Sequence, residues 1–125
     1  MKLSDANIIN NDSLVNESGI LGFATCKGTL FYNPGQIIRC EAKSNYTRFH
    51  FIDHKMLVVA KTLGDYENSL PSQFFLRIHR SDIINISHIR KHDSLGNLWL
   101  SDGTRLTVSK RRKARVIKAL KFLIL

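Results

Sequence analysis

The sequence of 125 residues is poor in several features, and each shortage excludes a class of protein. It has only two cysteines, Cys26 and Cys40, without Cys-x-x-Cys spacing, so neither a disulfide framework nor a zinc site is expected. No run of about 18 apolar residues occurs, so no membrane-spanning helix is predicted. The polar start, MKLSDANIINNDSL, lacks the apolar stretch of a secretory signal. A reducing cytoplasmic location fits these absences best.

Acidic residues are also scarce. The chain carries 10 Asp and Glu against 19 Lys and Arg, a formal net charge of +9. Seven of the basic residues lie between positions 110 and 125, where no acid occurs, whereas residues 1–20 are slightly acidic. An excess of this size indicates a polyanionic partner, either nucleic acid or an anionic membrane surface.

The length allows one domain, and an apolar content of 43% is enough to build its core. Residues 1–20 are rich in Asn, Ser and Asp without a sustained period, which predicts a flexible lead or a linker. Residues 21–125 are then the folded domain.

The pattern in this domain predicts many short strands and little helix. Asn45 to Ile52 alternates strictly, with Thr47, Phe49 and Phe51 on one face. A short helix is predicted around residues 63–70, with Thr62 as its N-cap, and a longer helix over 110–124, with Ile117, Leu120 and Ile124 on one side. The other expected strands lie at 25–32 (a hairpin), 37–41, 56–61, 74–78, 97–100 and 104–108, while 83–89 is either a strand or a helical turn.

Motifs for catalysis are absent. We find no glycine-rich phosphate loop and no Gly-x-Ser-x-Gly, and the acidic residues are scattered singly. The spacings His50-x3-His54 and His88-x3-His92 would suit a metal only on a helix, which the pattern does not predict there. We therefore expect no enzyme, no metal site and no cofactor.

Three polar, basic clusters interrupt the strands instead. They are Lys43 to Arg48, Arg77 to Ser81, and Ser109 to Lys113. Arg and Lys can pair with phosphates or guanine, Asn can pair with adenine, and Ser and Thr reach phosphates from loops. Each cluster could equally be a solvated loop, but three together in one small basic domain favour duplex DNA as the partner.

At these clusters the sequence resembles the LytTR family, the DNA-binding domains of LytR/AlgR-type bacterial response regulators. The words that carry the resemblance are Ile38–Tyr46, Lys61–Leu63, Leu70–Ser81 (LPSQFFLRIHRS), Ile84–Ile89 and Asp102–Arg112. Together they span about residues 22–122. The resemblance implies a mainly β fold, an elongated stack of small antiparallel sheets with one short central helix and a C-terminal helix.

It also implies a sequence-specific transcription regulator whose loops enter successive major grooves. Carried over by position, the residues that contact bases are Asn45 or Tyr46 in the first loop, Arg80 in the second and Lys110 or Arg111 in the third. The predicted contacts with the DNA backbone combine positions carried over in this way with polar neighbours from the three clusters. They are Lys43, Thr47, Arg48, Lys61, Thr62, His79, Ser81, Arg112 and Lys113.

The resemblance further implies self-association on paired sites and no membrane partner. The domain is then either the output domain of a two-component system, with an upstream receiver domain or a sensor kinase in the full system, or a stand-alone relative. Two alternatives stay open from the residues alone. The basic end Lys121 to Leu125 could bind an anionic membrane. Exposed aromatic side chains at Phe49 and Phe51 could stack on RNA bases.

Overall fold

The computed structural model describes residues 19–125, so nearly all of the predicted lead at 1–20 lies outside the described residues. The chain divides into two compact units, and the division falls after Pro34. The predicted domain of residues 21–125 therefore spans part of the first unit and the whole of the second.

The described part of the first unit is a β-hairpin. Strands β1 (Leu21–Thr25) and β2 (Gly28–Tyr32) pair antiparallel. The hydroxyl of Thr25 donates to the carbonyl of Gly28 at 2.7 Å, and Gly28 has φ +131°, a conformation that side chains rarely adopt. The predicted hairpin is confirmed, although its first strand begins earlier than expected.

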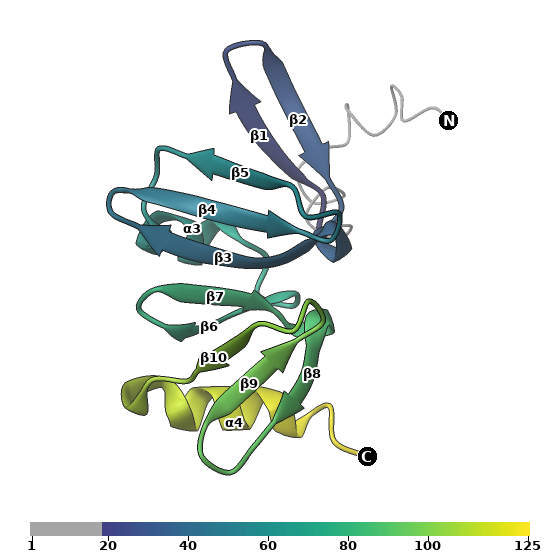
Figure 1. The fold of residues 1–125 in the computed structure, drawn as a ribbon, viewed down its shortest axis with the longest axis vertical. Helices are drawn as coiled ribbons and strands as arrows, with labels where there is room; N and C mark the ends of the chain where they lie inside the picture. Colours follow the sequence, from purple (N-terminus) through teal and green to yellow (C-terminus); the bar gives the residue numbers. More distant parts are fainter. Residues whose placement is uncertain (1–18) are drawn as a thin grey trace. The chain divides into compact units, whose positions relative to one another are not determined.

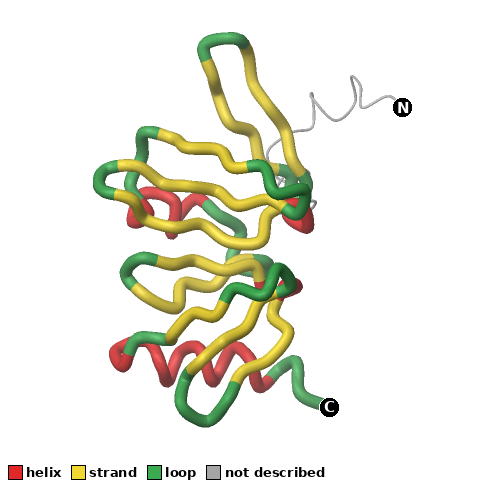
Figure 2. Tube along the Cα trace, viewed as in Figure 1, coloured by secondary structure: helices red, strands yellow, loops and turns green. Residues whose placement is uncertain are grey.

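The second unit contains two antiparallel sheets (Figures 1 and 2). A five-stranded sheet has the order β5-β4-β3-β7-β6 and a three-stranded sheet has the order β10-β9-β8. The mainly β fold with small antiparallel sheets is thereby confirmed. The strands are β3 (Ile37–Lys43), β4 (Tyr46–Phe51), β5 (Met56–Val59), β6 (Phe75–His79), β7 (Asp82–Asn85), β8 (Ile89–His92), β9 (Asn97–Leu100) and β10 (Arg105–Thr107).

Helix α3 (Leu63–Ser69) begins where the sequence predicts it. The Asp65 amide donates to the Thr62 hydroxyl at 3.3 Å, and the Thr62 amide donates to the Asp65 carboxylate at 3.2 Å. This reciprocal pair is a capping box, which satisfies amides that a helix start leaves unpaired. The helix ends at Ser69, directly before Leu70 and Pro71.

The alternation in β4 places one face of the five-stranded sheet against α3. Thr47, Phe49 and Phe51 are buried, and the rings of Phe49 and Tyr66 meet edge to face at 5.0 Å. Neither Phe49 nor Phe51 is available for stacking on a base. The alternative of an RNA-binding sheet face built on these two rings is therefore wrong.

A second core lies on the other side of β7. Ile78 and Ile84 from the five-stranded sheet pack with Leu98 and Leu100 of β9 and with Val116 of helix α4 (Lys113–Lys121). Because Ile83 is also buried, β7 is covered on both faces. The segment 83–89, for which the sequence allows either a strand or a helical turn, contains both: the end of β7, a 3₁₀ turn at Ile86–His88, and the start of β8.

The C-terminal helix differs from the prediction in two ways. Its first three predicted residues, Lys110–Arg112, form a separate 3₁₀ turn. The buried anchor is Val116, with Leu120 packed against the same core, while Ile124 is 73% exposed and lies beyond the helix. Among residues 19–125, no helix has the length and apolar character needed to cross a membrane.

Candidate nucleic-acid interface

Three turns of the second unit lie side by side. We name them the first turn (Lys43–Tyr46), the second turn (His79–Ser81) and the third turn (Ser109–Arg112). Backbone hydrogen bonds hold neighbouring turns together. The amide of Ala42, directly before the first turn, donates to the Ser81 carbonyl at 2.9 Å, and the Ser109 amide donates at 2.8 Å to the carbonyl of Ile78, directly before the second turn. Figure 1 shows all three on the same side of the unit, at the left of the view. The predicted clusters therefore converge on one surface.

The first turn presents polar side chains to solvent. Lys43 and Tyr46 face each other across the two strands, and Ser44 and Asn45 form the tip between them. Ser44 has φ 55°, in the left-handed region that few side chains adopt. Asn45 is exposed and Tyr46 is half-exposed, so both predicted base contacts lie at the surface.

The second turn exposes Arg80 between His79 and Ser81, which are hydrogen-bonded to each other. The Ser81 amide donates to His79 Nδ1 at 3.2 Å, and Ser81 Oγ lies 2.8 Å from the same nitrogen. Ser81 Oγ also donates to the Asp82 carboxylate at 3.0 Å. His79 Nδ1 and Ser81 Oγ are thus engaged within the turn and both residues are only partly exposed, which limits these atoms as predicted phosphate contacts.

The third turn is the most basic. Lys110 and Arg111 are exposed, and Lys113 follows at the first position of α4. The Arg112 amide donates to Ser109 at 3.1 Å, which closes the turn. Burial lowers the pKa of Arg112, and the positive charges of Arg77, Arg111 and Arg115 lower it further, whereas Glu67 opposes them. Cations are therefore crowded here, an arrangement that an anion would relieve.

One predicted contact does not reach the surface. Thr47 is fully buried on the α3 side of β4, and its hydroxyl donates to the Lys61 carbonyl at 2.7 Å. The prediction that the Thr47 side chain contacts the DNA backbone is wrong, because strand alternation turns it inward. Its neighbour Arg48 lies on the opposite face, partly exposed, with Nη1 3.5 Å from the Glu41 carboxylate.

The remaining predicted contacts lie at the start of α3. Lys61 and Thr62 are both exposed. The Lys61 ammonium lies 5.8 Å from the centre of the Tyr66 ring, and Thr62 caps the helix. Both can meet a phosphate, although the Thr62 hydroxyl already accepts one backbone hydrogen bond.

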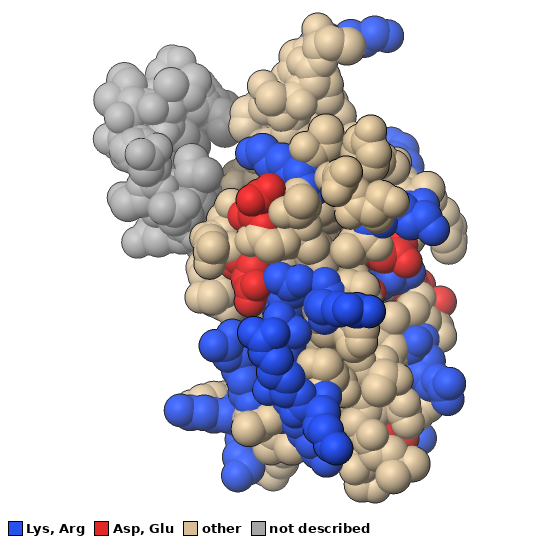
Figure 3. Space-filling view, turned by 90° about the vertical axis from the view of Figure 1, so that its left-hand side faces the viewer, with Lys and Arg blue, Asp and Glu red and all other residues tan. Residues whose placement is uncertain are grey.

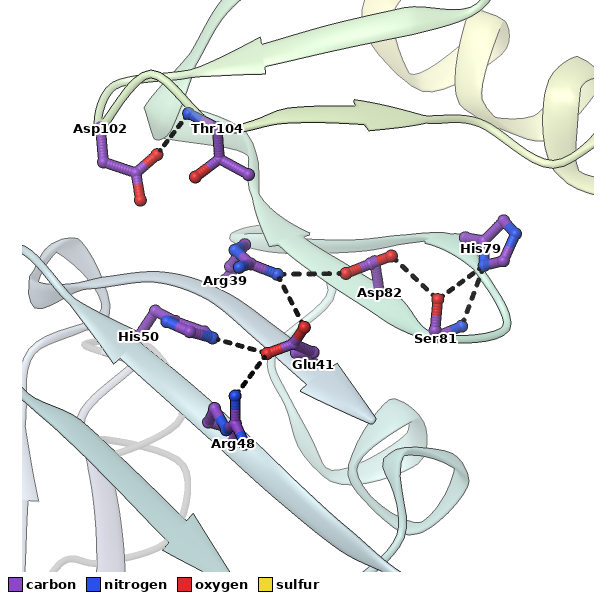
Figure 4. Close-up of polar contacts among 9 residues, drawn as sticks. All are labelled: Arg39, Glu41, Arg48, His50, His79, Ser81, Asp82, Asp102 and Thr104. Carbon is purple, nitrogen blue, oxygen red and sulfur yellow. Dashed lines mark hydrogen bonds and ion pairs between the residues drawn. The ribbon is translucent and has the colours of Figure 1, made fainter. Parts of the chain in front are cut away.

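A polar network links the second turn to β4 across the sheet (Figure 4). Arg39 Nη1 lies 3.3 Å from Asp82 and 3.8 Å from Glu41. Glu41 also pairs with His50 Nε2 at 3.0 Å and with Arg48. Burial raises the pKa of Glu41, but the hydrogen bond from His50 and the nearby positive charges outweigh it and hold that pKa below its ordinary value.

Arg77 is the cation whose exposure the sequence mispredicts. The pattern groups it with the exposed cations of the second cluster, yet its side chain is only 12% exposed. All three guanidinium nitrogens donate to protein acceptors, namely the Glu67 carboxylate and the carbonyls of His79 and Arg80. No sequence signal separates this buried arginine from Arg80, because Glu67 meets it only after folding.

The face that carries the three turns is strongly basic (Figure 3). Lys and Arg side chains gather there over the second and third turns and the start of α4. In the described part of the chain, no three His, Cys, Asp or Glu side chains form a group that could hold a metal ion. The chemistry of this face is therefore that of anion binding, and Asn45, Tyr46 and Arg80 are exposed on it.

Comparison with known proteins agrees with this chemistry. The family model described as the LytTr DNA-binding domain matches residues 27–121. Sensory transduction protein LytT of Bacillus subtilis is 32% identical over 104 residues, which cover 80% of this chain and 42% of that protein. The chain thus spans less than half the length of this curated relative.

A solved structure supports the same fold. The chain matches a Bacillus cereus structure described as a LytTr DNA-binding domain of a response regulator, with a TM-score of 0.68 and 25% sequence identity. The match covers 82% of this chain and 96% of that one.

Proposed function

The chain belongs to the LytTR family of DNA-binding domains, and from this premise we propose that its three turns read specific base pairs of duplex DNA. Asn45 or Tyr46, Arg80, and Lys110 or Arg111 contact bases in successive major grooves. Lys43, Arg48, Lys61, Thr62, Arg112 and Lys113 contact the flanking phosphates, with His79 and Ser81 at the edge of this set.

The observation that carries the proposal is the convergence of the three turns. They come from segments far apart in the sequence, yet hydrogen bonds from Ala42 to Ser81 and from Ser109 to Ile78 place them in one row with the second turn in the middle. A row of polar and cationic turns on one surface can place side chains in more than one groove of a duplex.

We further propose that the domain is the output module of a transcription regulator. Its relatives include a sensory transduction protein and a response regulator. Binding at paired promoter sites, together with an upstream receiver domain in the complete system, follows from that relationship as part of the proposal.

Selection of bound sequences from random duplex DNA tests the function directly. We expect enrichment of a short motif whose conserved bases fall into separate groups, one for each groove that a turn enters. Recovery of duplexes without any shared motif would contradict base reading and leave only phosphate attraction.

One observation favours a second candidate. Phe122, Leu123, Ile124 and Leu125 are exposed next to the basic helix α4, so this end could also bind an anionic membrane. Flotation with anionic and neutral vesicles separates the candidates. Binding that needs anionic lipid and is lost in Phe122→Ser would support the membrane, whereas selected duplex DNA as the stronger ligand would support base reading.

A further inference from the structure

The guanidinium of Arg77 lies inside the second turn and holds its backbone. Nη2 donates to the Arg80 carbonyl at 2.6 Å, and Nε donates to the His79 carbonyl at 3.2 Å. One planar group therefore fixes two consecutive peptide units of the turn that presents Arg80. Because the guanidinium fork is rigid, the two carbonyls are held in one relative orientation.

The same guanidinium is also bound by a side chain of helix α3. Nη1 of Arg77 donates to Glu67 Oε1 at 2.7 Å, and the two side chains are 12% and 32% exposed. A charge-assisted hydrogen bond of this length, partly shielded from water, is stronger than an exposed ion pair. Glu67 thus prevents Arg77 from swinging out toward solvent.

The turn needs this support because the ladder of β6 and β7 is irregular beside it. Arg77 pairs with Ile83 and His79 pairs with Asp82, so Ile78 is an extra residue in β6. A bulge of this kind interrupts strand pairing and redirects the chain that follows. The carbonyls of His79 and Arg80 find their partner in the Arg77 side chain.

From these contacts we propose that Arg77, anchored by Glu67, is a positioning residue that sets how Arg80 meets the duplex. The inference rests on the proposed function, since it takes Arg80 as a base contact. Arg77 itself stays off the DNA, because its side chain is only 12% exposed and three of its five N–H groups already donate within the protein.

The anchor also joins two parts of the interface. Glu67 lies on α3, which is capped by Thr62 and preceded by Lys61, both proposed phosphate contacts. The ion pair of Arg77 with Glu67 therefore links the second turn to α3. Loosening it would let Arg80 move relative to the phosphates that fix the register of the domain on DNA.

The test is Arg77→Lys, measured by affinity for the selected duplex, for duplexes with single base changes, and for a shuffled duplex. Lysine keeps the charge but cannot donate to both carbonyls and to Glu67 as a fork does. We expect roughly tenfold weaker binding to the selected duplex, weaker preference at the base read by Arg80, and unchanged binding to the shuffled duplex.

Arg90→Lys is the matched control. Arg90 also donates to nearby carbonyls, those of Ser87 and Ile89, but it lies on β8 outside the three turns. We expect this variant to bind both duplexes as the unchanged protein does. A loss for Arg90→Lys equal to that for Arg77→Lys would overturn a special role for Arg77.

A double-mutant cycle with Arg80→Ala separates positioning from direct contact. If Arg77 acts through Arg80, Arg77→Lys should cost almost nothing further in the Arg80→Ala background. Additive losses, or an equal loss on every duplex, would overturn the inference. If Arg80→Ala itself leaves base preference intact, the proposed function of Arg80 fails instead, so the two failures are distinguishable.

Glu67→Gln covers the case in which Arg77→Lys does not fold. It leaves Arg77 and both turn carbonyls in place and weakens only the anchor, because glutamine still accepts a hydrogen bond without the charge. We expect a loss of roughly threefold, confined to the selected duplex. Unchanged base preference in a folded Glu67→Gln protein would count against the anchor.

Discussion

At the scale of single residues, the structure divides the polar side chains in and beside the three turns into those that face solvent and those that bond to the protein's own backbone. Asn45, Arg80 and Lys110 are exposed, whereas Thr47 and Arg77 are turned inward and bonded to backbone carbonyls. The sequence predicts which segments are polar and basic. It cannot separate the two roles, since the Lys61 carbonyl that accepts from Thr47 and the Glu67 carboxylate that accepts from Arg77 lie on other segments of the chain.

Thr47→Val should lower stability without weakening DNA binding. The substitution removes the hydroxyl that donates to the Lys61 carbonyl. Because that carbonyl then lacks its donor, the free energy of unfolding should fall by roughly 1–3 kcal/mol. Urea unfolding checks the loss, and Thr47→Ser, which keeps the hydroxyl, is the control. A folded Thr47→Val protein with weakened DNA affinity would show that the threonine does contact the backbone.

Glu41→Gln should remove part of the acid sensitivity of the fold. The pKa of Glu41 in the folded protein lies below its ordinary value of 4.5, so the carboxylate stabilises the fold above that pH and loses this effect as the pH falls through the lowered pKa. Thermal unfolding at several pH values should show the variant less stable at neutral pH, with the difference closing in acid. A gap that stays constant with pH would rule out this contribution.

At the scale of elements, local signals in the sequence predict some structures and not others. The β4 alternation and the Thr62 cap are confirmed because both depend on neighbours within a few residues. The predicted buried face of α4 is displaced by one residue, because Val116 rather than Ile117 packs into the core with Ile78, Ile84 and Leu98. That selection comes from strands distant in sequence.

The capping box of α3 gives a paired test of stability against DNA contact. Asp65→Ala removes half of the box and should cost roughly 0.5–1 kcal/mol of stability without weakening DNA binding. Thr62→Ala should lower stability and also weaken binding, since Thr62 is a proposed phosphate contact. Urea unfolding and fluorescence anisotropy measure the two effects. Equal DNA affinity for both variants would remove Thr62 from the interface.

At the scale of the whole molecule, the net charge of +9 has two consequences that the structure separates. Exposed cations of α4 attract any phosphate backbone, whereas the base reading that we propose for the turn residues requires a particular DNA sequence. Sequence composition predicts the first consequence. The second needs the three turns to lie in one row, which depends on the pairing of β3 with β7 and on the contact of the third turn with β6.

Lys113→Ala should weaken binding to all duplexes alike and reduce the slope of log affinity against log salt by about one unit. Lys113 is exposed at the start of α4 beside the third turn. Lys55, exposed at the far end of β4 from the first turn, provides the control, and Lys55→Ala should leave the slope unchanged. A loss limited to the selected duplex would make Lys113 a base contact.

The most direct measurement is the affinity of Arg80→Ala for the selected duplex and for a complete set of its single-base variants. If the second turn reads a base, binding to the selected duplex weakens by roughly 1–3 kcal/mol and discrimination at one position disappears, while the other positions keep theirs. If the loss is the same for every duplex, Arg80 is a phosphate contact, and base reading by the second turn is contradicted.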